Sequence, residues 1–132
     1  MTTYDELYEL FMTNCRADGL SLPRTDEQKY NVIKNATMLY NNRLRDNLIC
    51  DDATETIDGK LNDDQKLIIA HYIRLTLLKN IRTYKNSIFT TFTQEIGIRN
   101  INAQLSSLKD EIAEEENTIG MLIFNMTDES IM

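Results

Sequence analysis

The chain has 132 residues and a formal net charge of −7 at pH 7, a length that predicts one domain, residues 1–132, with a hydrophobic core of its own. Four glycines and one proline favour long helices over an all-β fold, and the acidity argues against a protein that reads nucleic acid through a basic surface. No apolar run reaches the roughly 20 residues of a membrane span, and the acidic N-terminal stretch does not resemble a secretory signal.

Two helices are predicted in the first third of the chain, over residues 3–15 and 25–47. Each opens with a threonine that is followed three residues later by Glu or Gln, which is the spacing of a capping box. The first helix has a single apolar stripe, as expected of a short helix that docks onto a core or onto a neighbouring subunit.

Residues 48–61 are predicted to form a connection with a tight turn at Asp58-Gly59. The segment is rich in acids, but their spacing is not that of a calcium-binding loop. We therefore expect neither a metal site nor a cofactor. The acids in question are Asp51, Asp52, Glu55 and Asp58.

Residues 62–86 are predicted to form the central helix, capped by Asn62. Its apolar positions cover more than half of the circumference, which is more than one packing partner requires. Either it is a core helix with neighbours on several sides, or one flank packs against a second copy of the chain. His71 lies on this helix and is expected to be a satisfied core or interface histidine.

Residues 87–98 are rich in threonine and β-branched or aromatic residues, which favours an extended backbone. We expect an ordered loop here, or a single strand whose partner comes from another copy.

A long C-terminal helix is predicted from steps of four and three between apolar residues, which form a heptad seam. Glu115 interrupts the seam and Gly120 weakens the helix, so we expect an end or a bend within residues 117–120. The seam consists of Ile101, Leu105, Leu108, Ile112, Glu115, Ile119, Leu122 and Met126.

The last segment, residues 121–132, is apolar and rich in methionine. Either it folds back on the core or it docks on a partner protein, for which flexible methionines provide an adaptable surface. The candidate partner-binding residues are Ile119, Met121, Leu122, Ile123, Phe124 and Met126.

Charge is segregated along the chain. Residues 66–109 carry seven basic residues and one acid, whereas residues 46–64 and 110–132 are strongly acidic. Blocks of opposite sign can pair within a subunit or between adjacent copies. The candidate subunit–subunit residues are Lys79, Arg82, Lys85, Asp110, Glu114, Phe89 and Phe92.

Catalysis is not expected from this sequence. It has no nucleophile motif and no phosphate-binding glycine loop, and Cys15 and Cys50 stand apart. The two cysteines are expected to be reduced thiols, although a disulfide between them is open. The acids of residues 114–116 point to different sides of a helix and are expected to form a solvated face.

The order of these elements resembles the head–tail connector (adaptor, or head completion) proteins of tailed bacteriophages. The resemblance comprises an early helix, a loop with a DG turn, an apolar central helix that ends in basic residues, an extended threonine-rich stretch, a long helix and an apolar tail. It implies an all-α subunit, a small bundle of about four helices, that forms a ring beneath the portal, commonly twelvefold. It further implies that the C-terminal segment grips the portal, that the opposite side receives the next connector or a tail-completion protein, and that DNA passes through the lumen unread. The protein would then be a virion component that is assembled in the host cytoplasm.

The alternative is a small cytoplasmic helical regulator or inhibitor that binds one partner through its C-terminal heptads. Some other coiled-coil scaffold is a third option. The oligomeric state separates them, because a regulator of this kind is expected to form a tight dimer through its last helix.

Overall fold

A computed structural model describes residues 1–17, 20, 22–92 and 98–131 of the chain. In the described residues four helices and three short strands follow one another along the chain. In order they are β1 (Thr2–Thr3), α1 (Tyr4–Asn14), α2 (Asp26–Leu44), β2 (Ile49–Asp51), β3 (Thr56–Asp58), α3 (Asp63–Phe92) and α4 (Ile98–Ile131). The predicted all-α bundle of about four helices is confirmed, with the addition of a small sheet.

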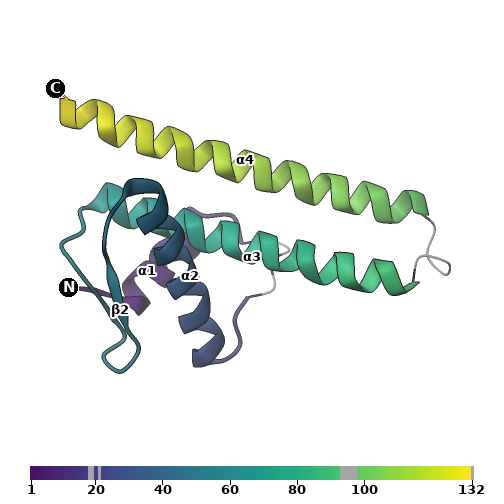
Figure 1. The fold of residues 1–132 in the computed structure, drawn as a ribbon, viewed down its shortest axis with the longest axis horizontal. Coiled ribbons are helices and arrows are strands. Elements are labelled where there is room, and N and C mark those ends of the chain that lie inside the picture. Colours follow the sequence, from purple (N-terminus) through teal and green to yellow (C-terminus); the bar gives the residue numbers. More distant parts are fainter. Residues whose placement is uncertain (18–19, 21, 93–97, 132) are drawn as a thin grey trace.

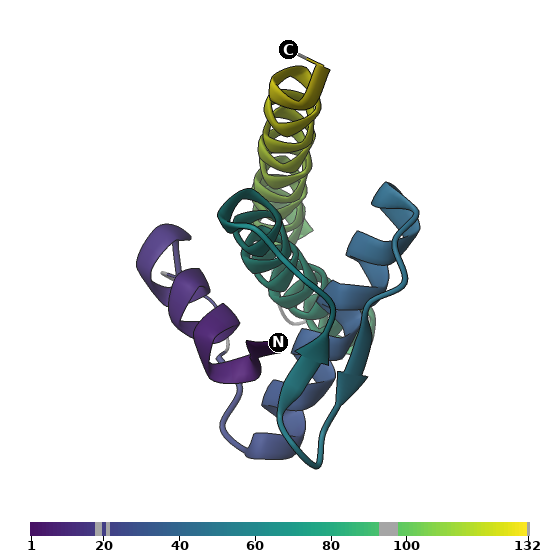
Figure 2. The ribbon, with the colours of Figure 1, turned by 90° about the vertical axis from the view of Figure 1, so that its left-hand side faces the viewer.

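Helix α3 is the centre of the fold. Figure 2 shows α1 on one side of it and α2 with the sheet on the other, while α4 runs antiparallel along it (Figures 1 and 2). The apolar side chains of α3 are accordingly buried on several flanks, and its widespread hydrophobicity is explained by neighbours within one chain. The fully buried residues of α3 include Ile68, Ile69, Ile73 and Leu78.

The predicted helix caps are present. The hydroxyls of Thr3 and Thr25 each accept the backbone N–H three residues further along, at 3.1 Å. Asn62 and Gln65 bond reciprocally, each side chain accepting the backbone N–H of the other at 2.8 and 2.9 Å. These bonds satisfy N–H groups that a helix leaves without partners at its start, and they fix where the helices begin.

Residues 48–61, predicted as an irregular connection, form a β-hairpin. The sheet has the order β1-β3-β2, and Ile57, fully buried, pairs with both Thr2 and Cys50. The turn of the hairpin lies within residues 52–55, where the Asp51 carboxylate accepts the N–H of Ala53. At Gly59, where a tight turn was expected, the chain bends after β3 with φ 126°. An alternating pattern of apolar and polar residues cannot be recognised in strands of only two or three residues.

Residues 87–92, predicted as extended, continue α3 as helix. The prediction was wrong because extending an existing helix needs only one new hydrogen bond per residue, whereas β propensity is a weak preference. Residues 93–97 lie outside the described residues.

The break expected within residues 117–120 is absent, since α4 is helical from Ile98 to Ile131. Glycine weakens a helix by only about 1 kcal/mol relative to alanine. Burial of Ile112 and Ile119 against α3 exceeds that amount, because each buried aliphatic side chain contributes about 1.5–3 kcal/mol. Residues 121–131 are therefore the last turns of a continuous helix.

Candidate functional site

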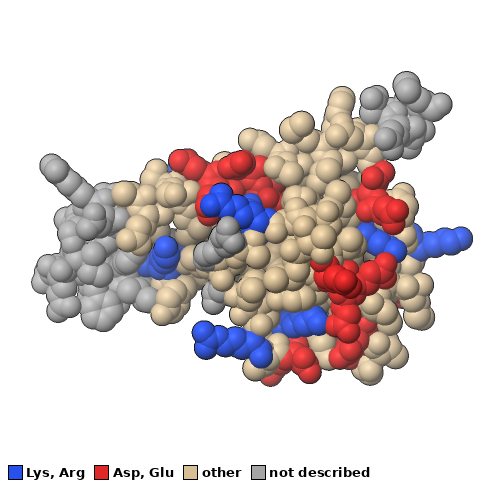
Figure 3. Space-filling view, turned by 180° about the vertical axis from the view of Figure 1, so that it is seen from behind, with Lys and Arg blue, Asp and Glu red and all other residues tan. Residues whose placement is uncertain are grey.

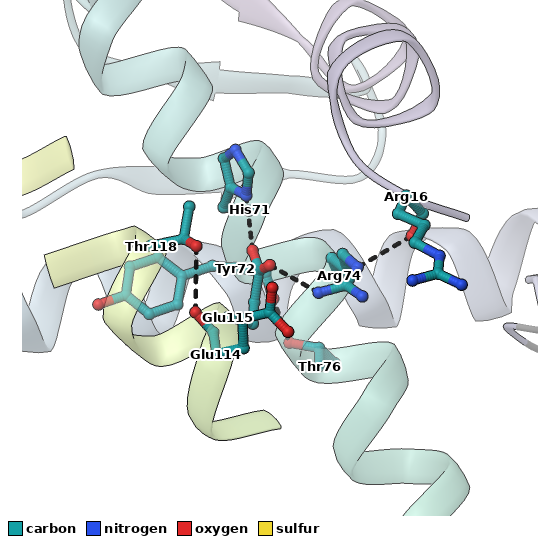
Figure 4. Close-up of polar contacts among 8 residues, drawn as sticks. All are labelled: Arg16, His71, Tyr72, Arg74, Thr76, Glu114, Glu115 and Thr118. Carbon is teal, nitrogen blue, oxygen red and sulfur yellow. Dashed lines mark hydrogen bonds and ion pairs between the residues drawn. The ribbon is translucent and has the colours of Figure 1, made fainter. Parts of the chain in front are cut away.

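Two features of α4 are candidates for function: a buried ionic cluster on its inner face and an apolar surface near its C-terminal end. In the cluster, the Glu115 side chain lies between His71 and Arg74 of α3 (Figure 4). Its Oε1 is 2.6 Å from His71 Nδ1, and its Oε2 accepts a hydrogen bond from Arg74 Nη1 at 2.7 Å. Arg74 Nε also donates to the carbonyl oxygen of Arg16 at 2.9 Å.

Glu115 is only 4 % exposed, so the prediction that it belongs to a solvated acidic face is wrong. It occupies a seam position, and the seam faces α3. Its neighbours Glu114 and Glu116 are exposed, as predicted. The available signal was the interruption of a heptad seam by an acid, together with His71 and Arg74 three residues apart on the preceding helix.

The cluster has a structural rather than a chemical character. His71 is satisfied within the chain, in agreement with the predicted core or interface histidine, and Glu115 is bonded by both of its oxygens. Burial, reinforced by the negative charge of Glu115, raises the pKa of the nearby Cys15 thiol to about 12. That thiol is therefore protonated and unreactive at neutral pH. Cys15 and Cys50 are both free thiols, and no disulfide joins them.

The apolar surface borders a groove between the end of α2, α3 and the C-terminal half of α4. The groove is open and has a volume of about 1250 Å³. Its walls combine aliphatic and aromatic side chains with three basic residues and one acid. They include Leu39, Arg43, Arg45, Tyr72, Leu75, Lys79, Glu116, Gly120, Met121 and Phe124.

The predicted partner-binding residues divide between this surface and the core. Met121 and Phe124 are 66 % and 69 % exposed, although both are large and apolar. Ile119 is 3 % exposed and belongs to the core, so it is not available to a partner. The remaining three are half-buried and pack against the core with one side, which means that the segment both folds back and leaves a face open. They are Leu122, Ile123 and Met126.

Of the predicted subunit–subunit residues, Lys79 is paired within the chain, 3.9 Å from the Glu116 carboxylate. Lys85 lines a second hollow, between α3 and α4, together with Glu111. Some of the opposite charges therefore meet inside one subunit. Arg82 is half-buried, Asp110 and Glu114 are exposed, and the side chains of Phe89 and Phe92 lie outside the described ones.

The acids of the hairpin are also used within the chain. Asp52 accepts the hydroxyl of Tyr4 and the ammonium of Lys34, both at 2.7 Å, and Glu55 accepts the hydroxyl of Tyr30. The Lys34 ammonium, with the Tyr4 hydroxyl, lowers the pKa of Asp52. On the face seen in Figure 3, acidic and basic side chains lie next to each other.

Within the described ranges, no group of three or more His, Cys, Asp or Glu side chains is placed to hold a metal ion. The described helices also include none with the length and hydropathy of a membrane span.

Comparison with known proteins places the chain in a phage context. Residues 1–128 match the family described as YomZ prophage protein. The chain is 40 % identical over 125 residues to the SPbeta prophage-derived uncharacterized protein YomZ of Bacillus subtilis (strain 168), a match that covers 95 % of each sequence. No solved structure matches the chain significantly. By the extent of both matches, the chain belongs to the YomZ prophage protein family.

Proposed function

We propose that the protein is a structural virion component, a head–tail connector subunit that assembles into a ring, commonly twelvefold in such proteins, beneath the portal. In this proposal it is not an enzyme and needs no cofactor. The C-terminal half of α4 docks on the portal, and the opposite side receives the next connector or a tail-completion protein. Assembly takes place in the bacterial cytoplasm, and the product resides in the virion.

The observation that carries the proposal is the open apolar surface of α4. Met121 and Phe124 are one helical turn apart on the same face, and both are about two-thirds exposed. A large exposed apolar side chain is unremarkable alone, but two together beside a groove are typical of an interaction site. Membership of a prophage protein family supports a partner of phage origin.

The proposal also includes the passage of DNA through the lumen of the ring, and the net charge of −7 supports this part. A conduit for DNA works best when its wall does not bind phosphates, and an acidic protein repels the DNA backbone. On this account the DNA slides through the lumen and is not recognised by sequence.

The decisive experiment is induction of a lysogen that lacks this gene, followed by electron microscopy of the lysate. The proposal expects filled heads and free tails that remain unjoined, and restoration of complete particles by a plasmid copy. Mass spectrometry of purified wild-type virions should detect the protein. Complete particles in the deletion strain would refute the proposal.

Native mass spectrometry tests the assembly directly. The subunit alone should be monomeric or weakly associated, and it should form ring complexes when mixed with the portal protein of the same prophage. Phe124→Ser should abolish these complexes, whereas Met12→Ser, which removes an exposed methionine from α1, should not. A tight dimer through α4 that ignores the portal would favour the helical regulator instead.

A further inference from the structure

Three features of the groove between α2, α3 and α4 are unfavourable in the isolated chain. The first is Gly120, in the middle of a helix, where glycine is among the least favourable residues. A Cβ built on Gly120 would meet no other side chain or neighbouring backbone within 4 Å. The fold of the chain therefore has no need of a glycine at this position.

The second feature is Arg45, which ends α2 in the left-handed conformation, with φ 56° and ψ 43°. Glycine or asparagine is favoured at such a position because a larger side chain is strained there. Arg45 lines the groove, as does Arg43 on the last turn of α2. Among the described residues, neither arginine forms a salt bridge, although the chain has an excess of acids.

The third feature is the apolar pair Met121 and Phe124, which borders the same groove. A missing side chain, two unpaired guanidinium groups and two exposed apolar side chains thus converge on one surface. Glycine lets a second backbone approach closely, while exposed apolar groups and cations favour a ligand with an apolar stripe and negative flanks.

We infer that this groove binds an acidic amphipathic helix of another protein, which crosses α4 at Gly120, buries its apolar stripe on Met121 and Phe124, and places its carboxylates against Arg43 and Arg45. The inference rests on the proposed function only in using the same face of α4 for docking. It adds the chemistry and the secondary structure of the segment that docks.

A second copy of this chain fits the groove less well. Two grooves facing each other would bring the same arginines together, and like charges repel. The exposed acids of α4 also do not form one acidic face, because Glu114 and Glu116 are two residues apart and point to different sides of the helix. Nucleic acid fits less well too, because its backbone offers nothing to bury on the apolar pair.

The test uses the full chain and a labelled model peptide of about 20 residues, long enough to form a helix. The peptide carries leucines along one face and glutamates on its flanks. A control peptide has lysine in place of every glutamate. By fluorescence anisotropy the acidic peptide should bind at least about tenfold more tightly than the basic one, and salt should weaken its binding.

Variants of the protein then locate the site. Gly120→Leu and the pair Arg43→Glu with Arg45→Glu should each weaken peptide binding by about tenfold or more. Gly120→Leu should leave the Tm unchanged or higher, because leucine is the better helix former and the space is empty. Matched controls are Ala113→Leu, on the exposed face of α4, and Arg24→Glu, outside the groove; both should bind the peptide as the wild type does.

Failure to bind the acidic peptide, equal binding of both peptides, or binding that Gly120→Leu does not change would overturn the inference. So would binding of a DNA duplex at this site with the same variant profile. If the chain forms a dimer and Gly120→Leu dissociates it, the occupant of the groove is a second copy of the chain and not a helix of another protein. These outcomes are independent of the virion experiment, so either proposal can fail while the other stands.

Discussion

The hairpin region and the C-terminal half of α4 each contain a glycine, but only the hairpin needs its glycine for folding. The comparison distinguishes residues that the fold requires from residues that are available for contact with another molecule. Gly59, after the hairpin, has φ +126°, and a Cβ on it would lie 2.6 Å from Leu48 Cδ2. A Cβ on Gly120, in α4, would instead meet no side chain and no backbone outside its own helical turns within 4 Å. The hairpin region therefore requires Gly59, whereas the fold of α4 does not require Gly120.

The same contrast holds for charge and burial. Around the hairpin, the carboxylates of Asp52 and Glu55 accept hydrogen bonds from Tyr4, Tyr30 and Lys34. Ile57 of the hairpin is fully buried. Helix α4 instead packs mainly on α3 and leaves apolar side chains in water. The hairpin region is closed by its own contacts, while α4 is held at its middle by buried apolar side chains and the Glu115 cluster and is open at its C-terminal end.

The largest expected effect is the loss of that cluster. Glu115→Ala leaves Arg74 buried without a counter-charge, and breaking a buried ion pair from one side costs about 3–5 kcal/mol. The free energy of unfolding from urea titrations should fall by that amount. Glu114→Ala, its exposed neighbour, is the matched control and should change the value by less than about 0.5 kcal/mol. Equal effects for the two variants would mean that α4 is not held at Glu115.

Alkaline pH should destabilise the N-terminal region next. Burial raises the pKa of Tyr40 to about 12, and burial with the Asp52 hydrogen bond raises the pKa of Tyr4. A raised pKa in the folded state means that the stabilisation is complete below the unfolded value of 10.0 and is lost as the pH rises through the folded value. Each fully buried tyrosine should reduce the free energy of unfolding by about 1.4 kcal/mol per pH unit above pH 10.

Urea titrations between about pH 9 and about pH 11 measure this slope. Tyr4→Phe should make it shallower, because the variant lacks one of the groups whose pKa is raised by folding. A stability that is constant across this range would contradict the buried environment of both tyrosines.

Gly59→Ala should cost about 1–3 kcal/mol, since it forces an L side chain into a conformation that favours glycine and against Leu48. Thermal unfolding followed by circular dichroism measures the loss. A companion variant, Leu48→Ala, relieves the clash in the double mutant but not the backbone strain. If Gly59→Ala is harmless alone, the hairpin does not have the described geometry.

Gly120→Ala should have the opposite sign and raise the free energy of unfolding by about 1 kcal/mol. The same thermal measurement applies, so the two glycine variants form a direct comparison of the regions. Destabilisation by Gly120→Ala would show that α4 needs its glycine for internal reasons.

The smallest effect is expected for Phe124→Ser. Because this side chain is mostly in water, its removal should change the stability of the isolated subunit by no more than about 0.5 kcal/mol. Urea titration checks this, and the binding experiments above supply the contrasting readout. A loss of several kcal/mol would place Phe124 in the core.

Much of the fold follows from local rules. The side chains of Thr3, Thr25 and Asn62 cap the helices at the positions that their spacing predicts, because a cap involves only residues three apart. The central helix follows from its unbroken apolar composition. The hairpin does not, since Ile57 becomes a core residue through pairing with the distant Thr2 and not through any pattern of its own.

The candidate site was only partly predictable for the same reason. Met121 and Phe124 were among the predicted partner-binding residues, but their exposure depends on which side of α4 packs against the core. The role of Glu115 depends on the alignment of α4 with α3, which no local pattern specifies. The groove needs one more long-range fact, that the end of α2 lies beside the C-terminal half of α4.

Glu115 also determines how the two long helices are aligned. A heptad seam looks almost the same after a slide of seven residues, so leucine and isoleucine alone would tolerate several alignments. Such a slide would bring Leu108 or Leu122 opposite His71 and Arg74, and it would leave the Arg74 guanidinium buried among apolar side chains without a counter-charge. The Glu115 carboxylate thereby selects one alignment of α4, a helix about 50 Å long, with α3. This alignment also determines how far the C-terminal end of α4 extends.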